Sequence, residues 1–157
     1  MKMLESFINL MGKYISYLIP VMTLLMVIII ISRYYFGIGR TDLQELVMYL
    51  HALLFLGCAG FVFNLDEHVR VDVFYRNASS KYKNMVDLLG GALFLMPVCL
   101  VIFIYSLDLV NMSWAIKEIS TEPGGLKYVY LQKSFIFLFP ITLTIAFLYK
   151  ASKILWK

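Results

Sequence analysis

The sequence predicts an all-α membrane protein with four transmembrane helices, a short N-terminal amphipathic helix and a short cytoplasmic interfacial helix between the second and third spans. The 157 residues are 61% hydrophobic and only 15% charged, with a mean hydropathy of +0.80, whereas a soluble domain carries about 25% charged residues. The apolar residues also gather into long runs separated by polar stretches. We therefore expect one integral membrane domain over residues 1–157.

The first span is expected at residues 14–32, which carry no charge. About 19 residues at 1.5 Å each reach about 28 Å, enough to cross the hydrocarbon core. A cleaved signal peptide is the competing interpretation, but its apolar region is shorter and ends at a small-residue cleavage site. Here Arg33 follows, as an interfacial cation. Before this span, apolar residues recur at helical spacing in segment 1–13, which predicts a helix at the membrane surface.

The second span is expected at residues 43–63. Its start carries two pairs with the spacing of a capping box, Thr41 with Gln44 and Asp42 with Glu45. Carboxylates in this position are favoured by the helix dipole. We therefore expect these side chains to begin the helix.

Two ionisable residues of the second span are candidates for chemistry. Glu45 lies one turn in, where it can reach the interface or pair with Arg33 or Arg40, so a structural or subunit-contact role is favoured over an ion or proton relay. His51 lies deeper, and a lone membrane histidine is typically a hydrogen-bonded packing residue. A haem ligand would need a second axial partner at matching depth, and His68 lies in a polar stretch instead.

Charge is densest in the central segment 66–75. His68, Arg70 and Asp72 alternate there with valine. Apolar residues fall at helical spacing over 71–78, which predicts a one-faced helix too short to span and lying in the interface.

The third span is expected at 85–108 and the fourth at 131–149. Pro97 predicts a kink in the third, and Pro140 lies in the middle of the fourth. Segment 120–126 between them contains Pro-Gly-Gly, which cannot continue a helix and favours a tight turn.

The charge distribution predicts the orientation. Four spans put the N-terminal tail, the whole connection 64–84 between spans two and three, and the C-terminal tail on one side. That side has nine of the 14 Lys and Arg residues, and the other side has five. By the positive-inside rule both termini and the central segment are cytoplasmic.

Several function classes are disfavoured. The net charge of +4 comes from basic residues beside apolar runs, so topology explains it and no nucleic-acid partner is expected. Cys58 and Cys99 lie within apolar runs without metal-ligand spacing and are interpreted as small buried hydrophobes. There is no phosphate-binding or nucleophile motif and no internal repeat. We expect no catalytic residues, cofactor or metal.

Short motifs along the chain resemble one known family. They are Arg33-Tyr34 after the first span, Asp42-x-x-Glu45 and Tyr49-x-His51-Ala52 in the second, His68-Val-Arg70-Val-Asp72-Val-Phe74 after it, and Glu122-Pro-Gly-Gly-Leu126 before the fourth. Together with the length and span number, they resemble the small, DctQ-like membrane subunit of tripartite ATP-independent periplasmic (TRAP) transporters.

The resemblance implies a scaffold for a large membrane subunit that carries the substrate and sodium sites. A periplasmic binding protein delivers the substrate, commonly a small organic acid, and the complex lies in the bacterial inner membrane. We expect structural or partner-contact roles for Arg33, Asp42, Glu45, His51, His68, Arg70 and Asp72. A haem-binding membrane anchor of a redox enzyme and a stand-alone small transporter are the alternatives.

The orientation is testable by cysteine labelling in cells. We expect Ser79→Cys to react only with a membrane-permeant thiol reagent and Gly124→Cys to react also with an impermeant one, because the positive-inside rule places position 79 in the cytoplasm. Labelling of Ser79→Cys by the impermeant reagent in intact cells would reverse the orientation.

Overall fold

The computed structural model describes residues 2–66 and 78–156. All regular elements within them are helical, and four stretches are long and apolar enough to cross a membrane. These are Glu5–Tyr34, Thr41–Asn64, Ser80–Ala115 and Val129–Leu155. The all-helical class and the four spans are confirmed, and each helical stretch is longer than the apolar run that predicted it.

The N-terminal helix leads almost directly into the first span. α1 (Lys2–Ser16) and α2 (Leu18–Tyr34) are separated only at Tyr17. α1 packs against α4 (Ala59–Asn64) and α8 (Leu138–Leu155), and its Ile8 is buried there. The predicted helix thus exists and packs on the other spans; its position at the membrane surface stays a prediction.

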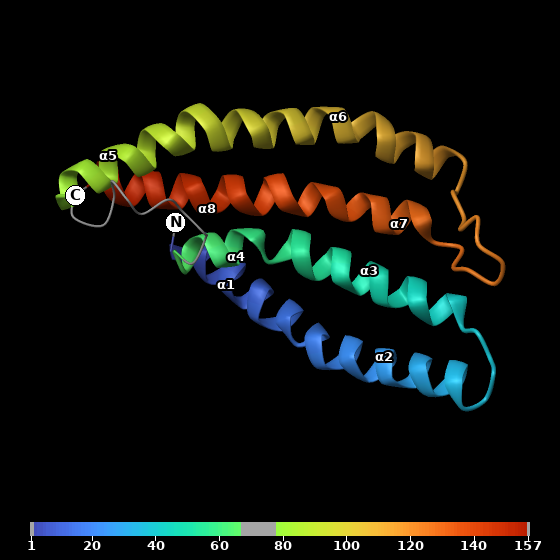
Figure 1. Ribbon diagram of the computed structural model, residues 1–157. Helices are drawn as coiled ribbons and strands as arrows, with labels where there is room; N and C mark the ends of the chain where they lie inside the picture. Colours follow the sequence, from blue (N-terminus) through green and yellow to red (C-terminus); the bar gives the residue numbers. More distant parts are fainter. Residues whose placement is uncertain (1, 67–77, 157) are drawn as a thin grey trace.

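The spans lie side by side in the order one, two, four, three (Figure 1). α2 packs on α3 (Thr41–Gly57), α4 packs on α8, and α6 (Met96–Ala115) packs on α8 and α7 (Val129–Ser134). In the most apolar 18-residue segment of each span, 22% of the residues in span two and 28% in span four are buried, against 6% in spans one and three. Spans two and four therefore form the centre, and the other two form the edges.

Two ends of this layer can be distinguished (Figure 1). Both termini lie at one end, which we call the terminal end, together with the C-terminus of α4 and the N-terminus of α5 (Ser80–Gly90). The loops 35–40 and 116–128 lie at the opposite end, which we call the loop end. The predicted interfacial helix falls on residues 67–77 and lies outside the described residues.

The prolines within the third and fourth spans each follow a locally altered helical turn. In the third span a π-helical turn, Gly91–Leu95, precedes Pro97, and the long helix arches (Figure 1). In the fourth span a 3₁₀ turn, Phe135–Phe137, precedes Pro140. Proline lacks an amide donor and its ring crowds the preceding turn, so a wider or tighter turn there removes the conflict. The kink expected at Pro97 is this π turn.

Close helix contact in the centre depends on small residues. The Gly60 amide donates to Thr142 Oγ1 at 3.3 Å, and a Cβ at Gly60 would lie 2.5 Å from the Thr142 carbonyl oxygen. Beside this contact Ala59, Cys99 and Leu143 form a buried core. Cys99 is thus the buried hydrophobe that was expected, whereas Cys58 is half-buried.

This contact predicts a stability difference between two glycines. We expect Gly60→Ala to destabilise the chain by about 1–3 kcal/mol, because the added methyl group overlaps backbone atoms of α8 that cannot rotate away. Denaturation of the purified chain in detergent would measure it. Gly90→Ala is the matched control, since a Cβ there meets no atom within 4 Å. Equal stability of the two variants would contradict the predicted role of Gly60.

Candidate functional site

The described charged side chains make their long-range contacts at the two ends of the layer. At the loop end Glu45 holds the connection between spans three and four, and we call this group the Glu45 site. At the terminal end Lys150 joins spans two, three and four, and we call this group the Lys150 site. Between them lies the apolar core.

The Glu45 site is a carboxylate bound by a turn. Leu126 donates its backbone N–H to Glu45 Oε2 at 2.6 Å, and the Ser120 hydroxyl donates to Glu45 Oε1. The Ser120 amide in turn donates to the Leu126 carbonyl oxygen at 3.0 Å. Hydrogen bonds to an ionised group are among the stronger ones in proteins. One carboxylate on α3 therefore fixes both ends of the turn.

The Pro-Gly-Gly sequence is required by this geometry. Gly124 has φ +77°, a backbone conformation that residues with a side chain rarely adopt. A Cβ at Gly125 would lie 2.4 Å from Ser120 Oγ and 2.7 Å from Glu45 Oε1. The two glycines thus allow the turn to form and let it approach the carboxylate.

The partner of Glu45 corrects two expectations. Glu45 binds the 120–126 turn rather than Arg33 or Arg40.

Arg40 instead donates to both oxygens of Asp42, at 3.0 and 2.8 Å. Arg40 is also the residue before α3, and no side chain caps that helix, so the predicted capping box is wrong.

A second ion pair at the loop end was missed by sequence reasoning. Lys133 on α7 donates to Glu118 at 2.7 and 2.5 Å, and this hydrogen bond lowers the pKa of Glu118. Nearby, Trp114 Nε1 donates to Ser134 Oγ at 2.8 Å. Both contacts join the end of span three to the start of span four, across the turn that Glu45 holds.

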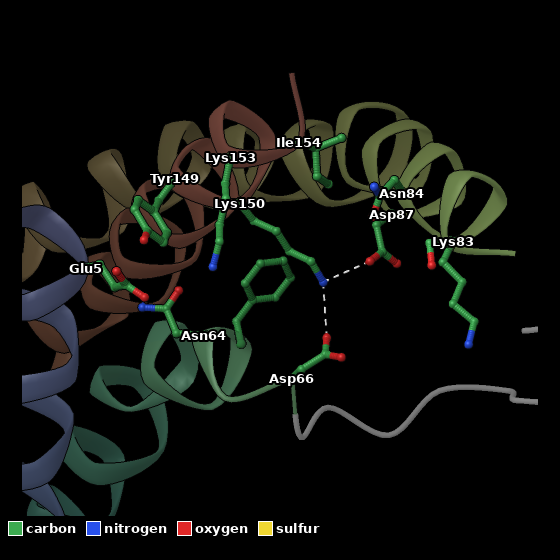
Figure 2. A pocket seen from close by; sticks show the side chains of 12 residues that line it. Glu5, Asn64, Asp66, Lys83, Asn84, Asp87, Tyr149, Lys150, Lys153 and Ile154 are labelled. Atoms are coloured by element: carbon green, nitrogen blue, oxygen red, sulfur yellow. Dashed lines mark hydrogen bonds and ion pairs between the residues drawn. The ribbon is translucent and has the colours of Figure 1, made fainter. Parts of the chain in front are cut away.

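The Lys150 site lies at the opposite end. Lys150 Nζ lies 3.1 Å from Asp66 Oδ1 and 2.9 Å from Asp87 Oδ2, as the dashed lines in Figure 2 show. The ammonium also lies 5.5 Å from the centre of the Phe63 ring. Lys150 comes from α8, 63 positions along the sequence from Asp87.

A polar cavity of about 380 Å³ adjoins this ion pair. Its lining combines both signs of charge, since Glu5, Lys83 and Lys153 lie around it with the Lys150 site (Figure 2). Among the described residues no group of three or more His, Cys, Asp or Glu side chains could hold a metal ion. The mixed charge joins helices and does not form a recognisable catalytic set.

The predicted site residues do not form one cluster. Arg33, Asp42 and Glu45 all lie toward the loop end, but the latter two have different partners. His51 was expected to be a packing residue within the bundle; it is exposed on α3, with its ring roughly parallel to that of Phe55 at 6.5 Å. The remaining three, His68, Arg70 and Asp72, lie outside the described residues.

Comparison with known proteins places the chain beside a transporter family. A family model described as "Tripartite ATP-independent periplasmic transporters, DctQ component" matches residues 22–155. No curated protein and no solved structure matches the chain significantly. The matched range contains most of α2, all of α3 to α8, and both the Glu45 and Lys150 sites.

The Glu45 site predicts an effect on the turn. We expect Glu45→Gln to speed hydrogen exchange of the Leu126 amide about tenfold, because loss of a charge-assisted hydrogen bond costs about 1.5 kcal/mol. Glu122→Gln is the control, since it lies in the same turn with an exposed side chain. Exchange rates that are the same in both variants would show that the carboxylate does not hold the turn.

Proposed function

The chain belongs to the DctQ family, the small membrane component of TRAP transporters, and from this premise we propose that it scaffolds the large transport subunit. It is a multi-pass membrane protein and a transporter component rather than an enzyme. Members of this family work within a tripartite transporter, with a large membrane subunit and a binding protein. The proposal concerns what this chain contributes to such a complex.

The proposal rests on where the ion pairs lie and which spans they join. At the terminal end Lys150 joins three spans, and at the loop end Glu45 and the Glu118–Lys133 pair hold spans two, three and four together. A substrate path needs polar groups turned toward a cavity at mid-depth. The described ion pairs that join helices instead lie at the two ends, which favours a rigid support over a conduit.

We infer the remaining features from the family resemblance. The large subunit would carry the sites for sodium and for a small organic acid, and the periplasmic binding protein would deliver that acid. The bacterial inner membrane would hold the complex, with both termini of this chain in the cytoplasm. The excess of Lys and Arg on the side of the termini supports this orientation. Residues 1–157 would then act as a single integral membrane domain.

In this orientation the Glu45 site faces the periplasm. The turn it holds is the connection between spans three and four, which a binding protein docking from that side would meet. The carboxylate and the two glycines give this turn a defined shape. A preformed surface loses less conformational entropy on binding than a mobile loop does.

The alternatives lack comparable support. A haem anchor needs a second axial ligand opposite His51, and His51 is exposed on the outside of α3. A stand-alone transporter needs a mid-depth polar site inside the chain, whereas the buried cluster between spans two, three and four, Ala59, Cys99 and Leu143, is apolar.

Reconstitution separates these functions. We expect the tagged chain to co-purify with a large hydrophobic polypeptide. Sodium-dependent uptake of an organic acid into proteoliposomes should require both polypeptides and the binding protein. The control is the tagged chain reconstituted alone. Uptake by that chain alone would contradict the scaffold role, and a Soret absorption band would indicate the haem anchor.

A further inference from the structure

His51 lies in the middle of a membrane span. It is ten residues beyond Thr41 in the 24-residue stretch Thr41–Asn64. At 1.5 Å per residue this is a depth of about 15 Å along the helix. Met48 and Phe55 share its face at helical spacing, and they are 58% and 68% exposed. We call these three residues the His51 face.

Lipid hydrocarbon offers no hydrogen-bond partner to the imidazole ring of His51. The ring has two nitrogens that donate or accept hydrogen bonds, and a buried polar group without a partner destabilises the protein. The neighbouring Phe55 ring offers neither a strong donor nor a strong acceptor. No hydrogen bond or ion pair to His51 is found among the described residues. By contrast, the exposed Thr23 hydroxyl in span one is satisfied, since it donates to the Ile19 carbonyl oxygen at 3.0 Å.

The edge helices, in spans one and three, expose mostly apolar side chains. Span one exposes Leu24, Val27 and Ile31 along α2. Span three exposes Phe94 and Val98 at its π-helical turn and the start of α6. Lipid chains cover such side chains without cost. Span three also exposes two polar side chains on α6, Tyr105 at 76% and Asp108. The His51 face differs from them in lying on the central span two, at a depth where lipid chains offer the imidazole no hydrogen bond.

We propose that the His51 face is the in-membrane docking surface for a transmembrane helix of the large subunit, one that presents a hydrogen-bonding group to the imidazole at mid-depth. The identity of the partner rests on the proposed function. Ionisable residues within spans face a protein interior or pair with a neighbour. Because α3 belongs to the central span two, a helix bound there would contact the most firmly held part of the layer.

Photo-crosslinking tests the surface in the assembled complex. Benzoylphenylalanine replaces Phe55 in one variant and Phe94 in the other. Both are exposed phenylalanines within spans, at 68% and 74%, so they form a matched pair. We expect an adduct with the large subunit from position 55, at least about fivefold stronger than from position 94.

The possible results separate the inference from the proposed function. If the large subunit co-purifies but crosslinks only from position 94, the surface is wrong and the scaffold role stands. Adducts with a second copy of this chain, or with lipid alone, from position 55 would also overturn the docking surface. If no large subunit co-purifies with the unsubstituted chain, both ideas fail.

Substitution of the histidine tests the hydrogen bond itself. We expect His51→Leu to lower the amount of large subunit that co-purifies about fivefold, as expected for one interhelical hydrogen bond. His51→Gln should retain it, because the amide can still donate and accept. The stability of the isolated chain should be the same in both variants. Equal co-purification of the large subunit with both would overturn the proposed hydrogen bond.

Discussion

Hydrocarbon offers no hydrogen-bond partner to a peptide group, and the architecture of this chain follows from that constraint. Every span is a helix, because only a helix satisfies its own backbone amides and carbonyls. Where proline interrupts the pattern, the helix changes to a π turn before Pro97 and a 3₁₀ turn before Pro140, and then resumes. Short polar side chains within the spans bond locally, as Thr23 does with Ile19.

The same constraint moves charge to the ends of the layer. Lys150 joins Asp66 and Asp87 at one end, while Glu45 and the Glu118–Lys133 pair act at the other. These contacts connect spans two, three and four, and α1 adds the N-terminal residues through its packing on α4 and α8. The result is a layer held at both ends. That is the mechanical property a supporting subunit needs, and the mid-depth His51 is where we propose that a partner binds.

Sequence reasoning succeeded where the signal is local. Long apolar runs gave the four spans, and Pro97 gave the site of the distortion in the third. Sequence reasoning failed where a side chain had several possible hydrogen-bond partners. The spacing of Asp42 and Glu45 fits a capping box, yet Arg40 pairs with Asp42, and Glu45 binds a turn 81 positions away. Local spacing cannot predict such a contact, because the turn reaches α3 only after spans three and four have packed.

The sequence by itself determined the membrane class, the number of spans, the Pro-Gly-Gly turn and the family resemblance, since each depends on composition or short motifs. Only the tertiary structure decided the order one, two, four, three, the partners of Glu45 and Lys150, and the outward position of His51. The physical reason is that helix periodicity places side chains around one axis but does not say which neighbour each side faces. Packing contacts such as that of Gly60 with Thr142 settle this.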